Sequence, residues 1–162
     1  MAVYKTKYFG ELTVDEESDF EYFDLSYNNK PMYISLSGFN GEKEKTAKCM
    51  EIIDRYAEID ETARKAIMEN FPINEVIRYY FKFHFETLDK EKIQELFGVT
   101  DINSLSVENA AKELEYPDLV FALEYDEIDL SVDYRVSKEF SDEVLCIKMD
   151  QDLNVLDFAR EN

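Results

Sequence analysis

The stretch from Leu119 to Val136 constrains the fold of this chain more than any other. Apolar residues occupy every second position in both halves of the stretch, on either side of Asp126 and Glu127. Successive side chains of a β-strand point to opposite faces of a sheet, so this alternation is typical of a strand with one buried face. Two such runs joined by a short acidic turn predict a β-hairpin with one apolar and one polar face. The apolar set is Leu119, Phe121, Leu123 and Tyr125, followed by Ile128, Leu130, Val132, Tyr134 and Val136.

The polar face of this hairpin carries the candidate binding residues. Asp129, Ser131 and Asp133 lie between the apolar positions of the second run, and Asp157 lies between apolar neighbours of a later predicted strand. Residues 116–162 carry 13 acidic and 4 basic residues, a net charge of −9, which is the highest charge density along the chain. We therefore expect Asp129, Asp133 and Asp157 to form an acidic sheet face that is open to solvent or to a partner.

Further strands are predicted at both ends of the chain. Val3–Leu12 has the composition of an edge strand, and Phe20–Tyr27 and Met32–Ser37 are expected to pair around an Asn-Asn-Lys turn. Asn tolerates positive φ, which a tight hairpin turn requires. Val144–Met149 and Val155–Ala159 predict a last pair of strands.

The middle of the chain changes to a helical period. Between residues 42 and 115, apolar residues recur three or four positions apart, as on one face of a helix. We expect one helix at 42–59, a second with Asp60 as its N-cap, a third at 73–88, and two short ones capped by Asp89 and Ser106. The order of strands, helices and strands predicts a single α+β domain over residues 1–162. Its antiparallel sheet is built from the N- and C-terminal strands, and the helical middle segment packs on one face.

The overall charge excludes some partners and favours others. The 162 residues include 37 acidic and 18 basic ones, for a net charge of −19. Nucleic acids and anionic membrane surfaces both require clusters of Lys and Arg, so neither is expected as a partner. No stretch approaches the roughly 20 apolar residues of a membrane span. The charge favours solubility and attraction to a basic protein.

The cysteines and the N-terminus indicate the compartment. Cys49 and Cys146 follow no disulfide or metal spacing, so we expect two free thiols in a reducing environment. Residues 1–10 lack the apolar segment of a secretory signal. We therefore expect a cytoplasmic protein.

The residues that could carry catalysis are few. His84 is the only histidine, and it lies between apolar residues of a predicted helix, as is typical of a buried core histidine. The 4 glycines do not form a phosphate-binding loop. Carboxylates are so numerous that spacing alone selects no general acid or base. No catalytic residue and no cofactor are predicted.

One local pattern resembles a calcium loop. Asp150, Asp152 and Asn154 have the spacing that opens such a loop, and Glu161 occupies the twelfth position. The sixth position holds Val155, however, where a calcium loop needs glycine. We therefore interpret the segment as a hairpin turn held by side-chain hydrogen bonds and expect no metal.

Three segments carry a resemblance to a known group of proteins. They are Tyr8–Leu12, Glu139–Leu145 and the chain ending from Met149 to Asp157. The chain is similar in these segments to an uncharacterised family of small acidic bacterial α+β domains. In general character it also resembles the immunity proteins of bacterial toxin systems, which are acidic, cytoplasmic and non-enzymatic. The resemblance implies no catalytic residues.

Three functions stay open on this reading. The first is a non-enzymatic acidic interaction module, an immunity or regulatory protein that binds a basic partner. The second is a small-molecule-binding domain whose acidity serves only solubility. The third is an acid–base enzyme. A clustered acidic patch would favour the first, and a deep pocket the other two.

Overall fold

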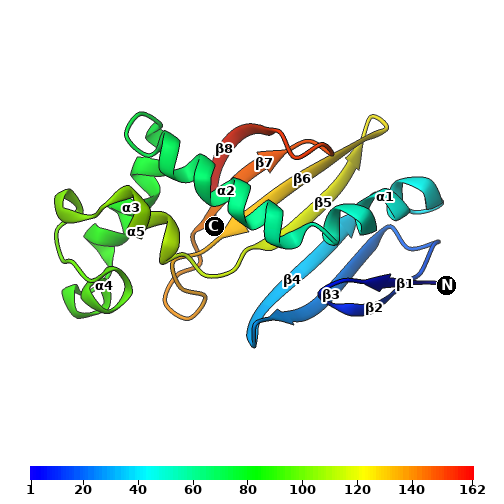
Figure 1. The fold of residues 1–162 in the computed structure, drawn as a ribbon, viewed down its shortest axis with the longest axis horizontal. Coiled ribbons are helices and arrows are strands. Elements are labelled where there is room, and N and C mark those ends of the chain that lie inside the picture. Colours follow the sequence, from blue (N-terminus) through cyan, green and yellow to red (C-terminus); the bar gives the residue numbers. More distant parts are fainter.

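The computed structural model describes residues 1–162 and contains a six-stranded sheet, a separate two-stranded hairpin and five α-helices (Figure 1). The strands are β1 (Ala2–Thr6), β2 (Gly10–Val14), β3 (Phe20–Tyr27), β4 (Lys30–Ser37), β5 (Asp118–Glu124), β6 (Glu127–Tyr134), β7 (Val144–Met149) and β8 (Val155–Glu161). The helices are α1 (Lys43–Ile53), α2 (Tyr56–Asn70), α3 (Glu75–Thr87), α4 (Lys90–Phe97) and α5 (Val107–Lys112), with a 3₁₀ turn at Ile102–Ser104. The predicted α+β class, with strands at both ends of the chain and helices in the middle, is confirmed.

The large sheet joins the two ends of the chain in the order β3-β4-β5-β6-β7-β8. Three antiparallel hairpins, β3–β4, β5–β6 and β7–β8, make up its length. The expected sheet was antiparallel throughout, but β4 and β5 pair in parallel, with Ile34 opposite Leu119. The reason is the connection: parallel neighbours need a long crossover, and the whole helical segment supplies it.

The N-terminal segment differs from the prediction of one edge strand at Val3–Leu12. It folds back on itself, so that Ala2–Thr6 pairs with Gly10–Val14. The Thr6 hydroxyl holds the turn, because it donates to the Gly10 carbonyl at 2.7 Å and accepts the Phe9 N–H at 3.0 Å. Gly10 has a φ of +70°, which favours glycine at this position.

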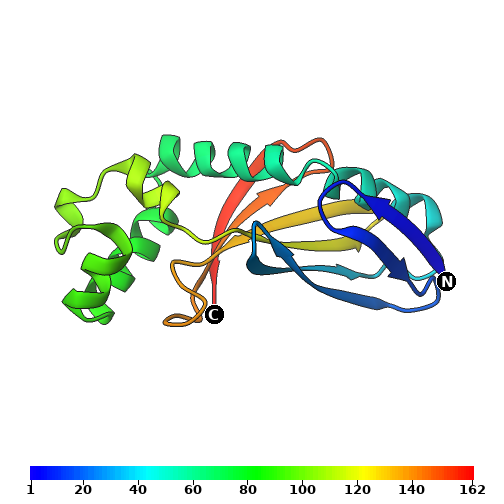
Figure 2. The same cartoon turned by 60° about the horizontal axis from the view of Figure 1, so that its bottom comes forward.

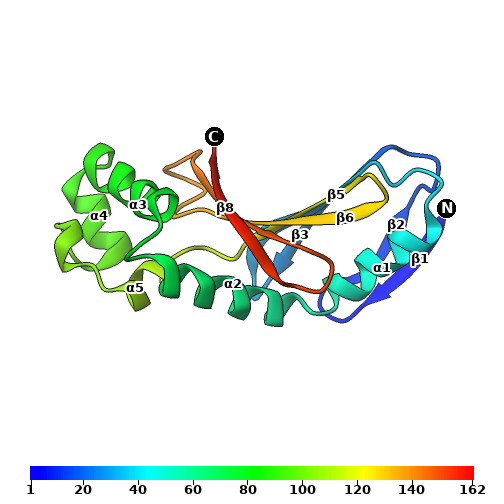
Figure 3. The ribbon, with the colours of Figure 1, turned by 90° about the horizontal axis from the view of Figure 1, so that it is seen from above.

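Helices α1 and α2 cover one face of the sheet, whereas the prediction placed the whole helical segment there (Figure 2). In Figure 2, α1 and α2 run along one side of the sheet, while α3, α4 and α5 gather beyond its end. Figure 3 shows the same separation from above, with β8 crossing near α3. Buried apolar side chains of the sheet, the helices and the β1–β2 hairpin form one continuous core. None of these helices is both long enough and apolar enough to cross a membrane.

Two helix boundaries were predicted wrongly. The helix expected at 42–59 is interrupted at Asp54 and Arg55, where the Asp54 carboxylate accepts the Lys7 N–H at 2.8 Å. Asp60 is not an N-cap, because it lies inside α2 and pairs with Arg64 one turn later. The caps predicted at Gly98 and Ser106 are confirmed: Gly98 has a φ of +75°, and the Ser106 hydroxyl accepts the Asn109 N–H.

The turn of the central hairpin lies one residue earlier than predicted. Glu124 and Glu127 are the closing pair, so Tyr125 and Asp126 form the turn with φ values of 50° and 64°. Tyr125 therefore leaves the apolar face on which it was expected and is 99% exposed. The apolar positions of the pattern are confirmed at Leu119, Phe121, Leu130 and Val132, which are all buried.

Candidate functional site

The turns of two hairpins meet at one end of the sheet and enclose an acidic groove of about 380 Å³. Five carboxylates line the groove: Asp126, Glu127, Asp129, Asp150 and Asp152. We call this region the acidic end. The charges come from β5–β6 and β7–β8, whose turns share one end because each hairpin runs out and back across the sheet.

The hydrogen bonds of Asp150 fix the shape of the second turn. One carboxylate oxygen accepts the backbone N–H groups of Asp152 and Asn154, both at 2.9 Å. The backbone hydrogen bond from Asn154 is the main cause that lowers the pKa of Asp150, so this carboxylate stays charged. The turn interpretation of the calcium-like pattern is confirmed by these bonds. Glu161 lies at the far end of β8, roughly 20 Å along the strand at about 3.3 Å per residue. That the turn binds no calcium stays a prediction.

Lys45 is the one basic residue at the acidic end. Its Nζ atom donates to the Asp126 carbonyl at 2.9 Å and lies 3.7 Å from the Asp126 carboxylate. This contact joins the β5–β6 turn to the first turn of α1. The other four carboxylates of the groove form no ion pair.

Exposed apolar side chains lie beside these charges. Tyr125 at the tip of the β5–β6 turn is 99% exposed, and Leu156 at the edge of the groove is 62% exposed. Aromatic residues supply much of the binding energy at protein interfaces, whereas a fully exposed tyrosine contributes little to the fold that carries it.

The three aspartates predicted as one acidic face separate into different environments. Asp129 is exposed in the groove, and Asp157 is exposed on β8 opposite Lys148, outside the groove. Asp133 was predicted to be exposed, but only 8% of its surface is accessible. Ser131, on the same face, is equally buried and donates a 2.5 Å hydrogen bond to the Asp133 carboxylate.

The position of β6 explains why Asp133 is buried. β6 is an inner strand, and Asp133 is flanked by the buried residues Asp118 on β5 and Cys146 on β7. Burial raises the pKa of Asp133, and the hydrogen bonds from Ser131 and Cys146 oppose this rise. Ser131 and Asp133 both lie on a strand that is paired on its two sides, and the alternation of the sequence overestimates how much of this face is open.

His84 is fully buried, as predicted, and both of its ring nitrogens have partners. Nδ1 lies 2.8 Å from the Tyr80 carbonyl, which can only accept, so Nδ1 carries the proton. Nε2 therefore accepts the hydroxyl of Ser141 at 2.6 Å, and Ser141 in turn accepts the Glu143 N–H. Burial lowers the pKa of His84 and keeps the ring neutral. Ser141 was not predicted as a partner of His84, because 57 residues separate the two in the sequence.

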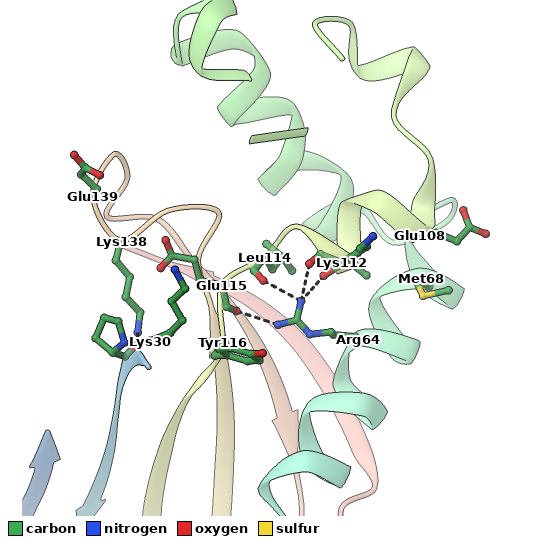
Figure 4. Close-up of a pocket in the computed structure, with 12 residues that line it drawn as sticks. Lys30, Arg64, Met68, Glu108, Lys112, Leu114, Glu115, Tyr116, Lys138 and Glu139 are labelled. Atoms are coloured by element: carbon green, nitrogen blue, oxygen red, sulfur yellow. Dashed lines mark hydrogen bonds between the residues drawn. The ribbon is translucent and has the colours of Figure 1, made fainter. Parts of the chain in front are cut away.

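A second cavity, of about 750 Å³, lies at the other end of the sheet, where β4 begins (Figure 4). We call it the α2–α5 cleft, since these helices form one wall, and the start of β4 and the loop after β6 form the other. Arg64 on α2 holds the helical wall together through its hydrogen bonds to the end of α5. It donates to the carbonyls of Ala111, Leu114 and Glu115 at 2.5–3.2 Å and to the Asp60 carboxylate at 2.8 Å. These carbonyls belong to the last turn of α5 and to the residues just after it, so Arg64 satisfies acceptors at the C-terminal end of that helix.

Comparison of the chain with models of protein families, with curated proteins and with solved structures finds no match. The resemblance to small acidic bacterial domains accordingly stays a prediction, and the function must be argued from the sites themselves.

Proposed function

We propose that this protein is a non-enzymatic interaction module that binds a basic protein partner through its acidic end, in an immunity or regulatory role. The observation that carries the proposal is the convergence of five carboxylates from two hairpin turns on one groove, with Tyr125 fully exposed beside them. Charge of one sign on a concave surface concentrates the field and attracts a partner of the opposite sign. Tyr125 and Leu156 supply the apolar contact that charge alone does not give.

A cytoplasmic location fits this role. Cys49 and Cys146 are both free and buried, which is the usual state of cysteines in a reducing compartment. The net charge of −19 opposes binding to nucleic acid or to anionic membranes, so the proposed partner is a protein.

The test compares two variants with equal net charge. Asp129→Lys/Asp152→Lys reverses two exposed carboxylates of the groove, whereas Glu61→Lys/Glu91→Lys makes the same change on exposed positions of α2 and α4. Each tagged protein is used to capture partners from the native cell extract at low salt, and captured proteins are identified by mass spectrometry. We expect a basic protein that the wild type and the helix variant retain and the groove variant loses.

Association kinetics of the purified partner provide the second measurement. The on-rate should fall steeply as salt rises, because the Debye length shrinks from about 10 Å at 0.1 M to about 3 Å at 1 M. If both variants lost the partner equally, the net charge of the protein, and not the acidic end, would account for binding. If the groove variant retained the partner, the acidic end would not be the binding surface.

A further inference from the structure

The α2–α5 cleft has the size and the lining of a small-molecule site. Its volume of about 750 Å³ falls within the range of roughly 300–1,000 Å³ that is usual for ligand pockets. Apolar surface comes from the start of β4, from α2, from α5 and from the segment between α5 and β5. The residues that supply it are Pro31, Met68, Ala111, Leu114 and Tyr116.

Basic residues are concentrated in this cleft, although the protein is strongly acidic. Four of its 12 lining residues are basic, against 18 of 162 in the whole chain, which is a threefold enrichment. Three of the 12 are acidic, close to the 37 of 162 found overall. A requirement for solubility does not explain this enrichment of basic residues, because solubility does not depend on placing them together on one concave surface.

Two of these four cations are engaged by the protein and two are free. Arg64 is held by the Asp60 carboxylate and by carbonyls at the C-terminal end of α5. Lys138 Nζ donates to the Pro31 carbonyl at 2.7 Å and to the Asp118 carboxylate at 3.1 Å. Lys30 and Lys112 form no ion pair. A flexible ammonium without a partner is available to a ligand.

Two of the three acidic residues of the cleft lie at its outer ends. Figure 4 shows the carboxylates of Glu108 and Glu139 at the two outer ends of the group of side chains. Glu115 lies on the same side as Lys30 in this view, and no ion pair joins the two. Tyr116 offers a further donor, because its oxygen accepts the Asn28 amide at 3.1 Å and its own O–H hydrogen stays free.

We propose that the α2–α5 cleft binds a small organic anion with an apolar body. The anionic group lies beside Lys30, close to Lys138, and the body packs on Tyr116, Leu114 and Met68. Lys112 gives the opposite wall a second positive charge. The site is independent of the proposed docking of a basic protein, since the β3–β4 and β5–β6 turns are at opposite ends of the sheet.

The test uses three probes that share one aromatic body and differ only in charge: 2-naphthoate, 2-naphthalenemethanol and 2-naphthylmethylammonium. Each is titrated into the full-length protein at 0.15 M salt, where the Debye length of about 8 Å limits the field of the distant acidic residues. Methyl NMR signals of Met68, Ala111 and Leu114 report binding in the cleft. We expect saturable shifts of these methyls and at least tenfold tighter binding of the anion than of the cation.

Matched variants assign the preference to the cleft. Lys30→Ala/Lys112→Ala should abolish the preference for 2-naphthoate, whereas Lys5→Ala/Lys90→Ala removes two unpaired lysines elsewhere and should retain it. Amide spectra check that both variants keep the fold. Shifts outside the cleft, equal binding of the three probes, no saturable binding, or a preference that survives Lys30→Ala/Lys112→Ala would each overturn the proposal.

Discussion

The hydroxyl of Tyr134 on β6 donates a 2.6 Å hydrogen bond to the carboxylate of Asp60 on α2. Tyr134 is fully buried, and the same carboxylate accepts Nε of Arg64 at 2.8 Å. The pair therefore joins the sheet to its longest covering helix, and through Arg64 it also reaches the end of α5.

Removal of this hydroxyl should be costly. Tyr134→Phe keeps the ring and deletes a hydrogen bond to a charged acceptor, so we expect a loss of about 2 kcal/mol in the free energy of unfolding. Urea denaturation measures the loss. Tyr125→Phe is the matched control, because that hydroxyl is fully exposed and its removal should change stability by less than about 0.5 kcal/mol. Equal effects in the two variants would contradict the role of the Asp60 contact.

The buried imidazole of His84 should make stability depend on pH. Burial lowers its pKa in the folded state below the ordinary value of 6.5, so the unfolded chain binds the proton more readily. The contribution of the neutral ring is complete above the unfolded pKa of about 6.5 and is lost as pH falls toward the folded pKa. Denaturation at several pH values between 8 and 5 should show this loss in the wild type relative to His84→Gln. NMR titration of the single imidazole provides an independent check, and a midpoint at or above 6.5 would contradict the stated direction.

Local patterns in the sequence predicted most of the strands because one face of each strand is buried. Leu119, Phe121, Leu130 and Val132 had to share a face, and the structure buries all four. The same reasoning could not find the parallel pairing of β4 with β5, because no local pattern records which strands become neighbours. It also missed the break at Asp54, where no glycine or proline marks the end of α1.

Sites depend on neighbours that are distant in sequence, and they were predicted less well. Asp129 was correctly predicted to be exposed. The same prediction was wrong for Asp133, because its burial depends on β6 being an inner strand. The α2–α5 cleft brings together Lys30, Lys112 and Lys138, which come from three separate segments. No spacing rule connects them, so only the folded chain reveals the cleft.

Asp129 and Asp133 should respond differently to charge reversal, although both lie on the same face of β6. Asp129→Lys changes an exposed side chain and should alter stability by less than about 0.5 kcal/mol. Asp133→Lys places a long cation in a buried position that is already hydrogen-bonded to Ser131, and we expect a loss of several kcal/mol. Chemical denaturation distinguishes the two. If the two variants were equally stable, Asp133 would be exposed, as the sequence alternation alone predicts.

Tyr125 and Asn28 occupy equivalent positions in two tight hairpin turns, so substituting each residue type for the other measures the backbone strain at Tyr125. Asn28 begins the β3–β4 turn and Tyr125 begins the β5–β6 turn, and both have a φ of 50°. Asn adopts this left-handed conformation at lower cost than Tyr, since its short polar side chain can bond to the local backbone. Tyr125→Asn should therefore raise the free energy of unfolding by about 0.5–1 kcal/mol, and Asn28→Tyr should lower it by at least as much. Asn28 also donates to Tyr116, so Asn28→Asp, which keeps a residue tolerant of positive φ but removes that donor, separates the two contributions.

If Tyr125→Asn stabilises the fold and weakens capture of the basic partner, Tyr125 is kept in the turn for binding at the expense of stability. A variant that is no more stable than the wild type would show that the turn holds Tyr125 without strain.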